Sequence, residues 1–512
     1  MTYGHVVLPG LRQAVNWGCC LAPAEAWPTL GQLASQIAGP TGALFVLAHP
    51  ATTGAYEQDT SWPGTGLGRE YPVLAALGRL DGFEVASYSN AGATCWTDWY
   101  DALSSGLTLT PTAGTDAVLD AFGTLPAGGW RMYADLGSPA RLDYDAWLAA
   151  VRAGRTFVTS LPLVPTFRVA DRDPGSALEA PADTTTLPIS FEIECVTGLA
   201  RVSLVGDRGT VWSLDLSRRT PPLSRLDTTF ALRTATPAWI ALRVDGVSGH
   251  RALLGLPAVA HTNAVRLLKS GAPRRDGAAC GRMLDRMDAL EALLSARRGW
   301  TSAEHVDSVY NPMRLARAVY SQAFRVAPAG FKLVAPPTTG TTRLSWSAAT
   351  DREPGDRVRY RIAVAADSTF RPSTVFYTDV PWTESTPVRP GLPCWWRIDA
   401  VDRGGNATRC DPPAFQATML VANASADDPE ASARPRAWPN PAHGAVRLEG
   451  LGRDVVILDV AGRCVASRTD GLRLEGGAWV WDVREHGRRA RPGLYWAVSR
   501  SRGVSLPITL LQ

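Results

Sequence analysis

Short apolar runs alternate with helical apolar spacings through the first 160 residues. Apolar positions recur at helical spacing in residues 26–37 and 144–151, and the runs between them have the composition of buried β-strands. One run, Gly42–Pro50, reads GALFVLAHP and delivers His49 to its C-terminal end. The order of strands and helices predicts an α/β unit over residues 1–160, although a complete β/α barrel needs about 250 residues.

The rest of the chain changes period several times and predicts a multidomain protein, α/β and then all-β. Residues 161–272 alternate apolar and polar positions in short runs, as in an antiparallel β-sandwich. Residues 273–325 return to helical spacing, with two apolar stripes that predict a helical pair packed on a neighbouring domain. Residues 326–420 alternate again, residues 421–436 have the polar, Ala- and Pro-rich composition of a linker, and residues 437–512 form a last small β module.

Composition argues against several classes of function. The net charge of the 512 residues is only +4, so a polyanionic partner such as nucleic acid is not expected. No apolar run approaches the roughly 20 residues of a membrane span. The eight cysteines show no C-x-x-C spacing, which argues against a zinc ribbon or a thioredoxin motif. The sequence contains neither the glycine-rich P-loop motif of nucleotide-binding proteins nor a GxSxG nucleophile elbow.

Three segments of the first unit deliver a polar side chain to the end of a predicted strand. His5 lies in YGHVVLPG, His49 precedes Pro50, and Asp116 ends LTLTPTAGTD. Imidazole nitrogen and carboxylate oxygen are ligands of zinc, manganese and iron, so convergence of these three side chains would form a divalent-metal site. The alternative interpretation is structural, because a histidine beside a strand can serve only as a hydrogen-bonding residue.

Two further residues accompany this cluster. Glu84, in the short strand GFEVA, is either a carboxylate that orients a ligand histidine or a structural residue. Arg131 is a candidate for binding an anionic group of the substrate or transition state, because a guanidinium can pair with two oxygens at once. The alternative for Arg131 is a salt bridge to Asp135 or Asp120.

Six motifs, in the order found here, resemble the CehA/McbA branch of the PHP-type metallohydrolases. They are GHVVLPG (Gly4–Gly10), AHP (Ala48–Pro50), DGFEVAS (Asp81–Ser87), AGTDA (Ala113–Ala117), WRMYADL (Trp130–Leu136) and AVRAGRTFVTS (Ala150–Ser160). The similarity continues to AHTNAVRL (Ala260–Leu267) and covers roughly the first 320 residues. It implies a distorted seven-stranded β/α barrel, here partial, that holds divalent metals and hydrolyses phosphoester, amide or carbamate bonds through a metal-bound hydroxide.

The resemblance also assigns residues. His5 corresponds to the histidine of the family's GH strand, His49 to that of its HP strand, and Asp116 to the aspartate of its GTD motif. The family opens with an HxH strand and a glutamate, which would lie upstream of Met1, and it often has histidine where this chain has Val118. We therefore expect that the chain lacks an N-terminal part containing a signal peptide and further ligands. Expressed alone, it should bind metal weakly and hydrolyse little.

Two C-terminal regions resemble known modules. Residues 326–420 are similar to a fibronectin type III module, with Trp346 in LSWSAATD as the early core tryptophan. Residues 437–512 are similar to the C-terminal sorting domain of type IX secretion, an Ig-like β-sandwich also related to flagellar hook-capping modules. The motifs that carry this similarity are WPNPAHGAVRL, VVILDVAGRCV, WVWDVRE and RPGLYWAV. They imply a bacterial protein that the type IX machinery exports to the cell surface or the medium.

Two hypotheses of function follow. The first is an exported metal-dependent hydrolase with accessory β modules that acts on a small-molecule substrate. The second is a non-catalytic cell-surface protein for display or adhesion, in which the barrel is degenerate. An HxH strand and a glutamate encoded upstream of Met1 would favour the enzyme.

Overall fold

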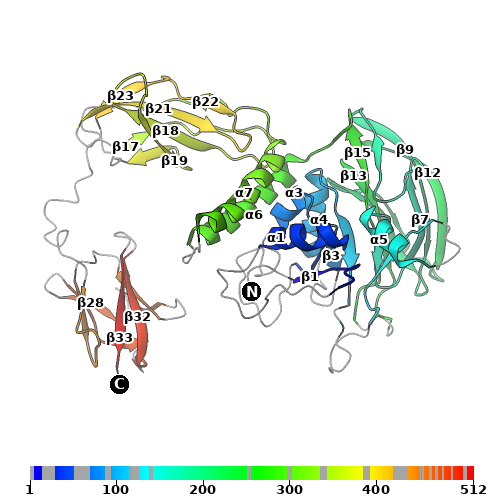
Figure 1. The fold of residues 1–512 in the computed structure, drawn as a ribbon, viewed down its shortest axis with the longest axis horizontal. Coiled ribbons are helices and arrows are strands. Elements are labelled where there is room, and N and C mark those ends of the chain that lie inside the picture. The colour runs from blue at the N-terminus through cyan, green and yellow to red at the C-terminus, as the bar shows by residue number, and fades with distance from the viewer. Residues whose placement is uncertain are drawn as a thin grey trace.

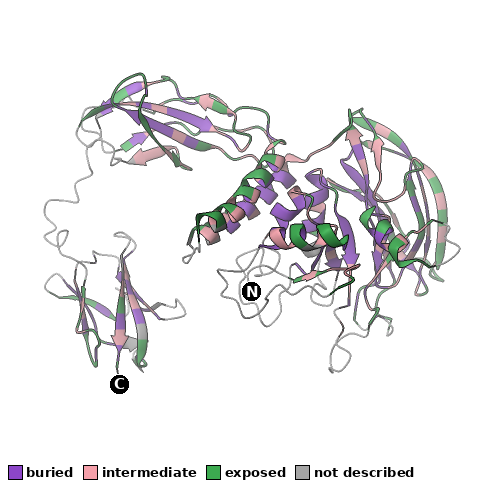
Figure 2. Ribbon diagram, in the orientation of Figure 1, coloured by how far each residue is buried: buried purple, intermediate pink, exposed green. Residues whose placement is uncertain are grey.

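The computed structural model describes most of the chain. The described residues are 5–13, 29–50, 70–86, 94–115, 117, 127–137, 142–250, 253, 255–296, 302–334, 343–384, 392–418, 436–449, 451, 455–459, 464–467, 471–475, 478–485, 488–499 and 504–511. Buried residues are concentrated in the sheets and on the helix faces that meet them (Figure 2). Among the described residues, no helix is long and apolar enough to cross a membrane.

A four-stranded sheet with neighbouring helices forms the N-terminal unit (Figure 1). Its strands lie in the order β1 (His5–Val7), β2 (Val46–Ala48), β3 (Gly82–Ala86) and β4 (Thr110–Ala113). The helices are α1 (Leu30–Leu33), the π-helix η2 (Ala34–Ala38), α2 (Gly39–Thr41), α3 (Tyr71–Ala76), α4 (Thr94–Ser104) and α5 (Tyr144–Arg152). β1 is antiparallel to β2, whereas β2, β3 and β4 are parallel, so their carboxyl ends meet at one edge. These four strands form an open sheet and do not show the partial barrel that we expected.

Local sequence signals explain several of these elements. Thr29 and Gln32 form a capping box at the start of α1. The Asp143 carboxylate accepts hydrogen bonds from the first backbone N–H groups of α5. β2 is buried along its whole length, as expected for a parallel strand read from a continuous apolar run.

Two sheets form a β-sandwich after the N-terminal unit. The larger sheet has the order β11 (Gly209–Asp215), β10 (Leu199–Gly206), β13 (Trp239–Gly246), β14 (Val259–Thr262), β6 (Thr156–Thr159) and β5 (Arg131–Ala134). A further strand, β15 (Val265–Lys269), pairs with β13 and also with β8 (Ala177–Glu179) and β16 (Ala272–Pro273). The smaller has the order β12 (Arg225–Ala235), β9 (Thr184–Glu194) and β7 (Leu163–Val169). Alternate side chains such as Val202, Leu242 and Phe191 pack together in one buried cluster. β5 and β6 precede the boundary that we expected at residue 161, yet β6 pairs with β14, so the larger sheet crosses that boundary.

Two long helices, α6 (Gly277–Ala296) and α7 (Ala303–Ser321), pack on the N-terminal unit. Met283 of α6 and Tyr320 of α7 belong to the same buried cluster as Trp99 of α4 and Trp239 of β13. The Tyr320 hydroxyl donates to the Pro72 carbonyl in α3 at 2.7 Å. The apolar stripes of both helices therefore face a neighbouring domain, as the periodicity predicted.

Residues 331–418 form an antiparallel sandwich of the fibronectin-like kind. One sheet pairs β17 (Arg343–Ser345) with β20 (Trp382–Glu384), and the other contains β19 (Ser373–Thr378), β18 (Arg359–Ala365), β21 (Pro393–Val401), β22 (Ala407–Arg409) and β23 (Phe415–Thr418). Trp346 is 2 % exposed and lies in the core between them, as predicted. Arg403, in the turn after β21, donates to the Gly281 carbonyl in α6 at 2.6 Å and pairs with Asp285, so this sandwich is tied to α6.

The C-terminal module contains two four-stranded antiparallel sheets. The first sheet has the order β24 (Arg436–Trp438), β25 (Val446–Glu449), β29 (Ala478–Trp481) and β28 (Leu472–Glu475). The second has the order β27 (Cys464–Ser467), β26 (Val455–Asp459), β32 (Gly493–Ser499) and β33 (Val504–Leu510). Two short strands, β30 (Arg484–Glu485) and β31 (Arg488–Arg489), pair with each other. Trp479, Trp481 and Tyr495 share one buried core, so the module has its own apolar centre. Residues 421–435 of the expected linker lie outside the described residues.

Candidate functional site

His5 and His49 meet at one end of the four-stranded sheet. Because β1 is antiparallel to β2, the first residue of β1 lies beside the last residue of β2, and His5 pairs with Ala48. The Nδ1 atom of His5 lies 2.9 Å from Nε2 of His49, with the two rings nearly perpendicular. His49 is 9 % exposed, and His5 is exposed. Two of the three predicted metal ligands are thus brought together.

The backbone of His49 is unusual. Its φ is +28°, in the left-handed region that L-residues other than glycine seldom adopt. Its N–H donates to Oε2 of Glu84 at 2.6 Å, which holds the residue in this conformation. Strained residues that the surrounding structure holds in place are concentrated at functional sites, so this conformation supports a role for the imidazole.

Glu84 connects the ends of three strands. Its carboxylate binds the backbone of His49 after β2, and its Oε1 lies only 2.6 Å from where a Cβ on Gly114 would stand, after β4. Position 114 therefore requires glycine as long as Glu84 keeps this place. Because the Glu84 carboxylate accepts from the backbone amide of His49, it fixes the position of the histidine through the backbone. Gly114 was not among the predicted site residues, because its role depends on where the Glu84 carboxylate lies.

The other two predicted site residues are placed differently. Asp116 lies outside the described residues, whereas Thr115 before it accepts hydrogen bonds from the N–H groups of Gly128 and Trp130. Arg131, at the start of β5, donates to the carbonyl oxygens of Gly128 at 2.7 Å and Ser160 at 3.1 Å. Its guanidinium thus binds backbone oxygens of two loops, and the contacts of the described residues do not include a salt bridge to Asp135.

The histidine pair fits a metal ion in its donor chemistry. Two nitrogen ligands of one tetrahedral zinc lie about 3.3 Å apart, since each Zn–N bond is about 2.0–2.1 Å. The observed 2.9 Å therefore needs a shift of only about 0.4 Å between the rings. Among the described residues, no third His, Cys or carboxylate forms a close group with this pair. A carboxylate at Asp116 is the residue that would supply the next ligand.

One close acidic group does occur among the described residues. Ligand atoms of Asp351, Glu353 and Asp356 lie within 4.8 Å of one another. Oε2 of Glu353 accepts from the N–H groups of Arg325 at 2.7 Å and Val326 at 2.8 Å, just after α7. Burial raises the pKa of Asp356 to about 6. These contacts tie the fibronectin-like sandwich to the preceding segment, so we assign the group a structural role.

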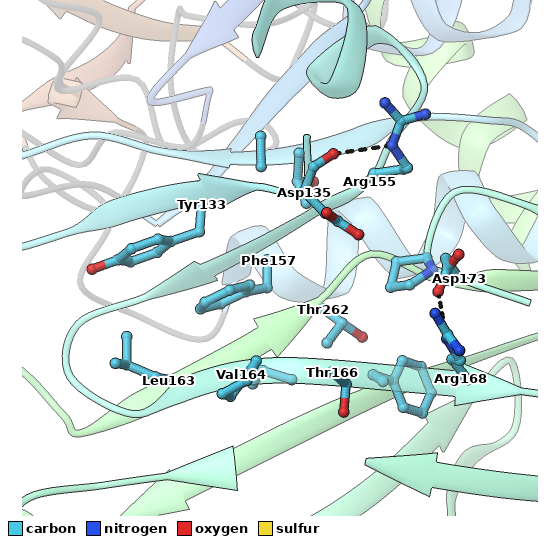
Figure 3. Close-up of a pocket in the computed structure, with 15 residues that line it drawn as sticks. Tyr133, Asp135, Arg155, Phe157, Leu163, Val164, Thr166, Arg168, Asp173 and Thr262 are labelled. Atoms are coloured by element: carbon cyan, nitrogen blue, oxygen red, sulfur yellow. Dashed lines mark hydrogen bonds and ion pairs between the residues drawn. The ribbon is translucent and has the colours of Figure 1, made fainter. Parts of the chain in front are cut away.

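A cavity of about 320 Å³ opens between the antiparallel pair β5–β6 and β7 (Figure 3). The rings of Tyr133 and Phe157 stack in parallel on its upper wall, with centroids 4.9 Å apart. Leu163 and Val164 of the opposite sheet line the other wall. Arg155, at the edge of the cavity, donates to the Asp135 carbonyl. None of the predicted metal ligands lines this cavity.

Comparison with known proteins shows no family for the chain. No family model matches it, and no curated protein matches it. Among solved structures, it is similar to the fibronectin(III)-like modules of Clostridium thermocellum CbhA, at 12% identity and a TM-score of 0.14, over 50% of this chain and 94% of that one. It is also similar to the FN1–FN3 domains of chicken CNTN1, at 8% identity and a TM-score of 0.15, over 68% and 98%. These TM-scores are too low to carry an argument, so the fibronectin-like description rests on the strand pairing of residues 331–418.

Proposed function

We propose that the protein is an exported metal-dependent hydrolase of the CehA/McbA PHP type, acting on phosphoester, amide or carbamate bonds of a small-molecule substrate. The observation that carries this proposal is the 2.9 Å approach of His5 Nδ1 and His49 Nε2 at the edge where the parallel strands end. The N-terminal sheet would then be part of a β/α barrel. Zinc, manganese and iron are the divalent ions that suit this donor set.

In this proposal each residue has a distinct task. His5, His49 and Asp116 would hold the ion, and when bound it would lower the pKa of a coordinated water and polarise the scissile group. Glu84 fixes the position of His49 through its backbone amide. Arg131 would bind an anionic group of the substrate through N–H groups other than the two that hold the carbonyls of Gly128 and Ser160.

The test is metal content and turnover measured on the same preparations. Untagged protein is dialysed to equilibrium against zinc, manganese or iron, the metal bound at equilibrium is measured by mass spectrometry, and hydrolysis of chromogenic phosphodiester and carbamate esters is measured on the same samples. His49→Ala should lose bound metal, and His443→Ala, on an exposed histidine of the C-terminal module, should not. Equal metal content in both variants would refute the site.

Export is a separate part of the proposal. The C-terminal module would be the sorting signal read by the type IX machinery, and the protein would reside at the cell surface or in the medium. In support, residues 436–511 contain two sheets around a core of their own, as a separable signal requires. A reporter fused to residues 437–512 should be exported by a bacterium with this machinery and retained by a mutant without it.

The alternative function is non-catalytic display or adhesion at the cell surface. It is favoured by the share of the chain given to β-sandwiches and by the backbone contact of Glu84, which a purely structural residue would also make. Joint replacement of His5 and His49 distinguishes the two functions: a hydrolase loses turnover, whereas a display protein has none to lose and keeps its binding partner.

A further inference from the structure

Three polar residues form a row across the outer face of the larger sandwich sheet. Ser203 of β10 pairs with Arg243 of β13, and Arg243 pairs with His261 of β14. On the same face, Arg201 pairs with Asp245. The alternate residues of these strands face the apolar centre of the sandwich. The face with the polar row packs in part on the N-terminal unit, through apolar residues such as Trp239 and Ala241.

α4 covers part of this row and fixes the histidine. The His261 ring is fully buried, stacked on Trp96 at 4.9 Å and edge-on to Trp99. Its Nδ1 lies 2.8 Å from its neighbour's carbonyl, that of Thr262, and its Nε2 lies 2.7 Å from the Tyr100 hydroxyl. A carbonyl can only accept, so Nδ1 carries the proton and Nε2 accepts from Tyr100. Burial lowers the pKa of His261 to about 3, which keeps this arrangement neutral.

The same contacts fix Arg243. Because the Tyr100 proton points to His261, the hydroxyl oxygen is left to accept, and the Arg243 guanidinium lies beside it. Burial raises the pKa of Tyr100 to about 12, although the positive charge of Arg243 acts to lower it. Asp245 accepts from Nε and Nη2 of Arg243 at 3.3 and 3.1 Å. Arg243 is thus held on two sides while it keeps further N–H groups for another acceptor.

A cavity of about 310 Å³ opens where α4 no longer covers the row. Its polar lining comprises Tyr100, Arg201, Ser203, Thr210, Arg243 and Asp245. Arg201 and Arg243 are diagonal neighbours on the sheet, roughly 7–8 Å apart at the backbone, so both guanidinium groups can reach one small ligand. Ser203 is only 5 % exposed, and we find no hydrogen bond from its hydroxyl to the residues that the structure describes.

We propose that this cavity binds a small oxyanion, a phosphate or the phosphate group of an ester. Two arginines line it, and the carboxylates of Asp245 and Asp215 lie beside them, so the charges nearly balance and recognition rests on N–H and O–H donors, including the hydroxyls of Ser203 and Thr210. A guanidinium held in a fixed orientation binds tetrahedral oxyanions well, because it presents two parallel N–H donors. The site uses none of the residues proposed to bind metal, and it does not depend on the hydrolase proposal.

The experiment is calorimetric titration of the full chain with inorganic phosphate. The protein is first treated with a chelator and dialysed, so that phosphate on a metal ion cannot contribute. Sodium chloride at matched ionic strength is the reference titration. Wild type should bind one phosphate saturably, Arg201→Gln should weaken binding about tenfold, and Ser203→Ala should weaken it about threefold, as expected for one charged and one neutral donor.

Arg233→Gln is the matched control, because Arg233 is an exposed arginine of β12 in the other sheet of the same sandwich. It should leave phosphate binding unchanged. The proposal is overturned if phosphate gives no saturable signal above chloride, or if Arg201→Gln and Arg233→Gln behave alike. Tighter binding of phenyl phosphate than of inorganic phosphate would identify the esterified group as the ligand, and the reverse order would identify the free ion.

Discussion

The buried histidine of β14 makes the stability of this region depend on pH. His261 has a pKa lowered from 6.5 to about 3, and the largest cause is burial, which disfavours the charged imidazolium. The unfolded chain has no such restriction and takes up a proton below pH 6.5. The native state is therefore fully stable above pH 6.5 and loses stability as the pH falls from 6.5 towards 3.

The size of this loss follows from the two pKa values. At pH 5 protonation of the unfolded state lowers the free energy of unfolding by about 2 kcal/mol, because the folded state does not take up this proton. The equilibrium constant for unfolding rises roughly thirtyfold. By pH 3.5 the same relation gives about 4 kcal/mol. Replacing His261 by Gln removes the titrating group and keeps an amide that can face Tyr100. The variant should lack this part of the pH dependence.

Hydrogen exchange measured by mass spectrometry on the full chain tests this prediction. Protection of the peptide covering residues 257–268 is compared at pH 8 and pH 5, after correction for intrinsic exchange rates. Wild type should lose about thirtyfold more protection than His261→Gln over this range. Residues 359–365 of β18 contain no histidine and serve as the internal control. Equal losses in wild type and His261→Gln would refute the argument.

Three further predictions concern packing and joints. Asp101→Ala should lower the free energy of unfolding by about 3 kcal/mol, measured by urea unfolding followed by circular dichroism. Oδ2 of this buried residue lies 3.1 Å from the Arg286 guanidinium, which would lose a partner for its charge. Trp346→Ala should lower the stability of residues 331–418 by about 3–5 kcal/mol, because it removes a large side chain from their core. Limited proteolysis should therefore cut these residues first and spare the N-terminal unit. Arg403→Gln removes the pair with Asp285 and should widen the interdomain distances seen by small-angle scattering without unfolding either part.

Individual strands could be predicted from the sequence, but the contacts between side chains of different strands could not. The apolar run of residues 42–50 correctly placed a buried strand ahead of His49. That His5 would touch it could not be read from the pattern, because the contact depends on β1 running antiparallel to β2. The role of Gly114 appears only once the Glu84 carboxylate occupies the space of its missing side chain.

In the sandwich, too, the contacts between side chains could not be predicted, because they depend on the register between strands. Alternation predicted a β-sandwich over residues 161–272, and the motif AHTNAVRL of residues 260–267 entered only through the family resemblance. Alternation shows which residues share a face, but it does not show which residues of other strands lie beside them. The row of Ser203, Arg243 and His261 therefore needed the pairing of three strands that are far apart in the chain. The membership of β5 and β6 in the sandwich sheet is a pairing of the same kind.

The most direct test of the central proposal is to locate the metal. Crystals of the protein soaked in zinc would be measured at the zinc absorption edge, and an anomalous difference map calculated. We predict a peak about 2.0–2.1 Å from both Nδ1 of His5 and Nε2 of His49, with the two rings moved slightly apart. A map without a peak there, in which the nitrogens keep their 2.9 Å contact, would contradict the proposed metal site.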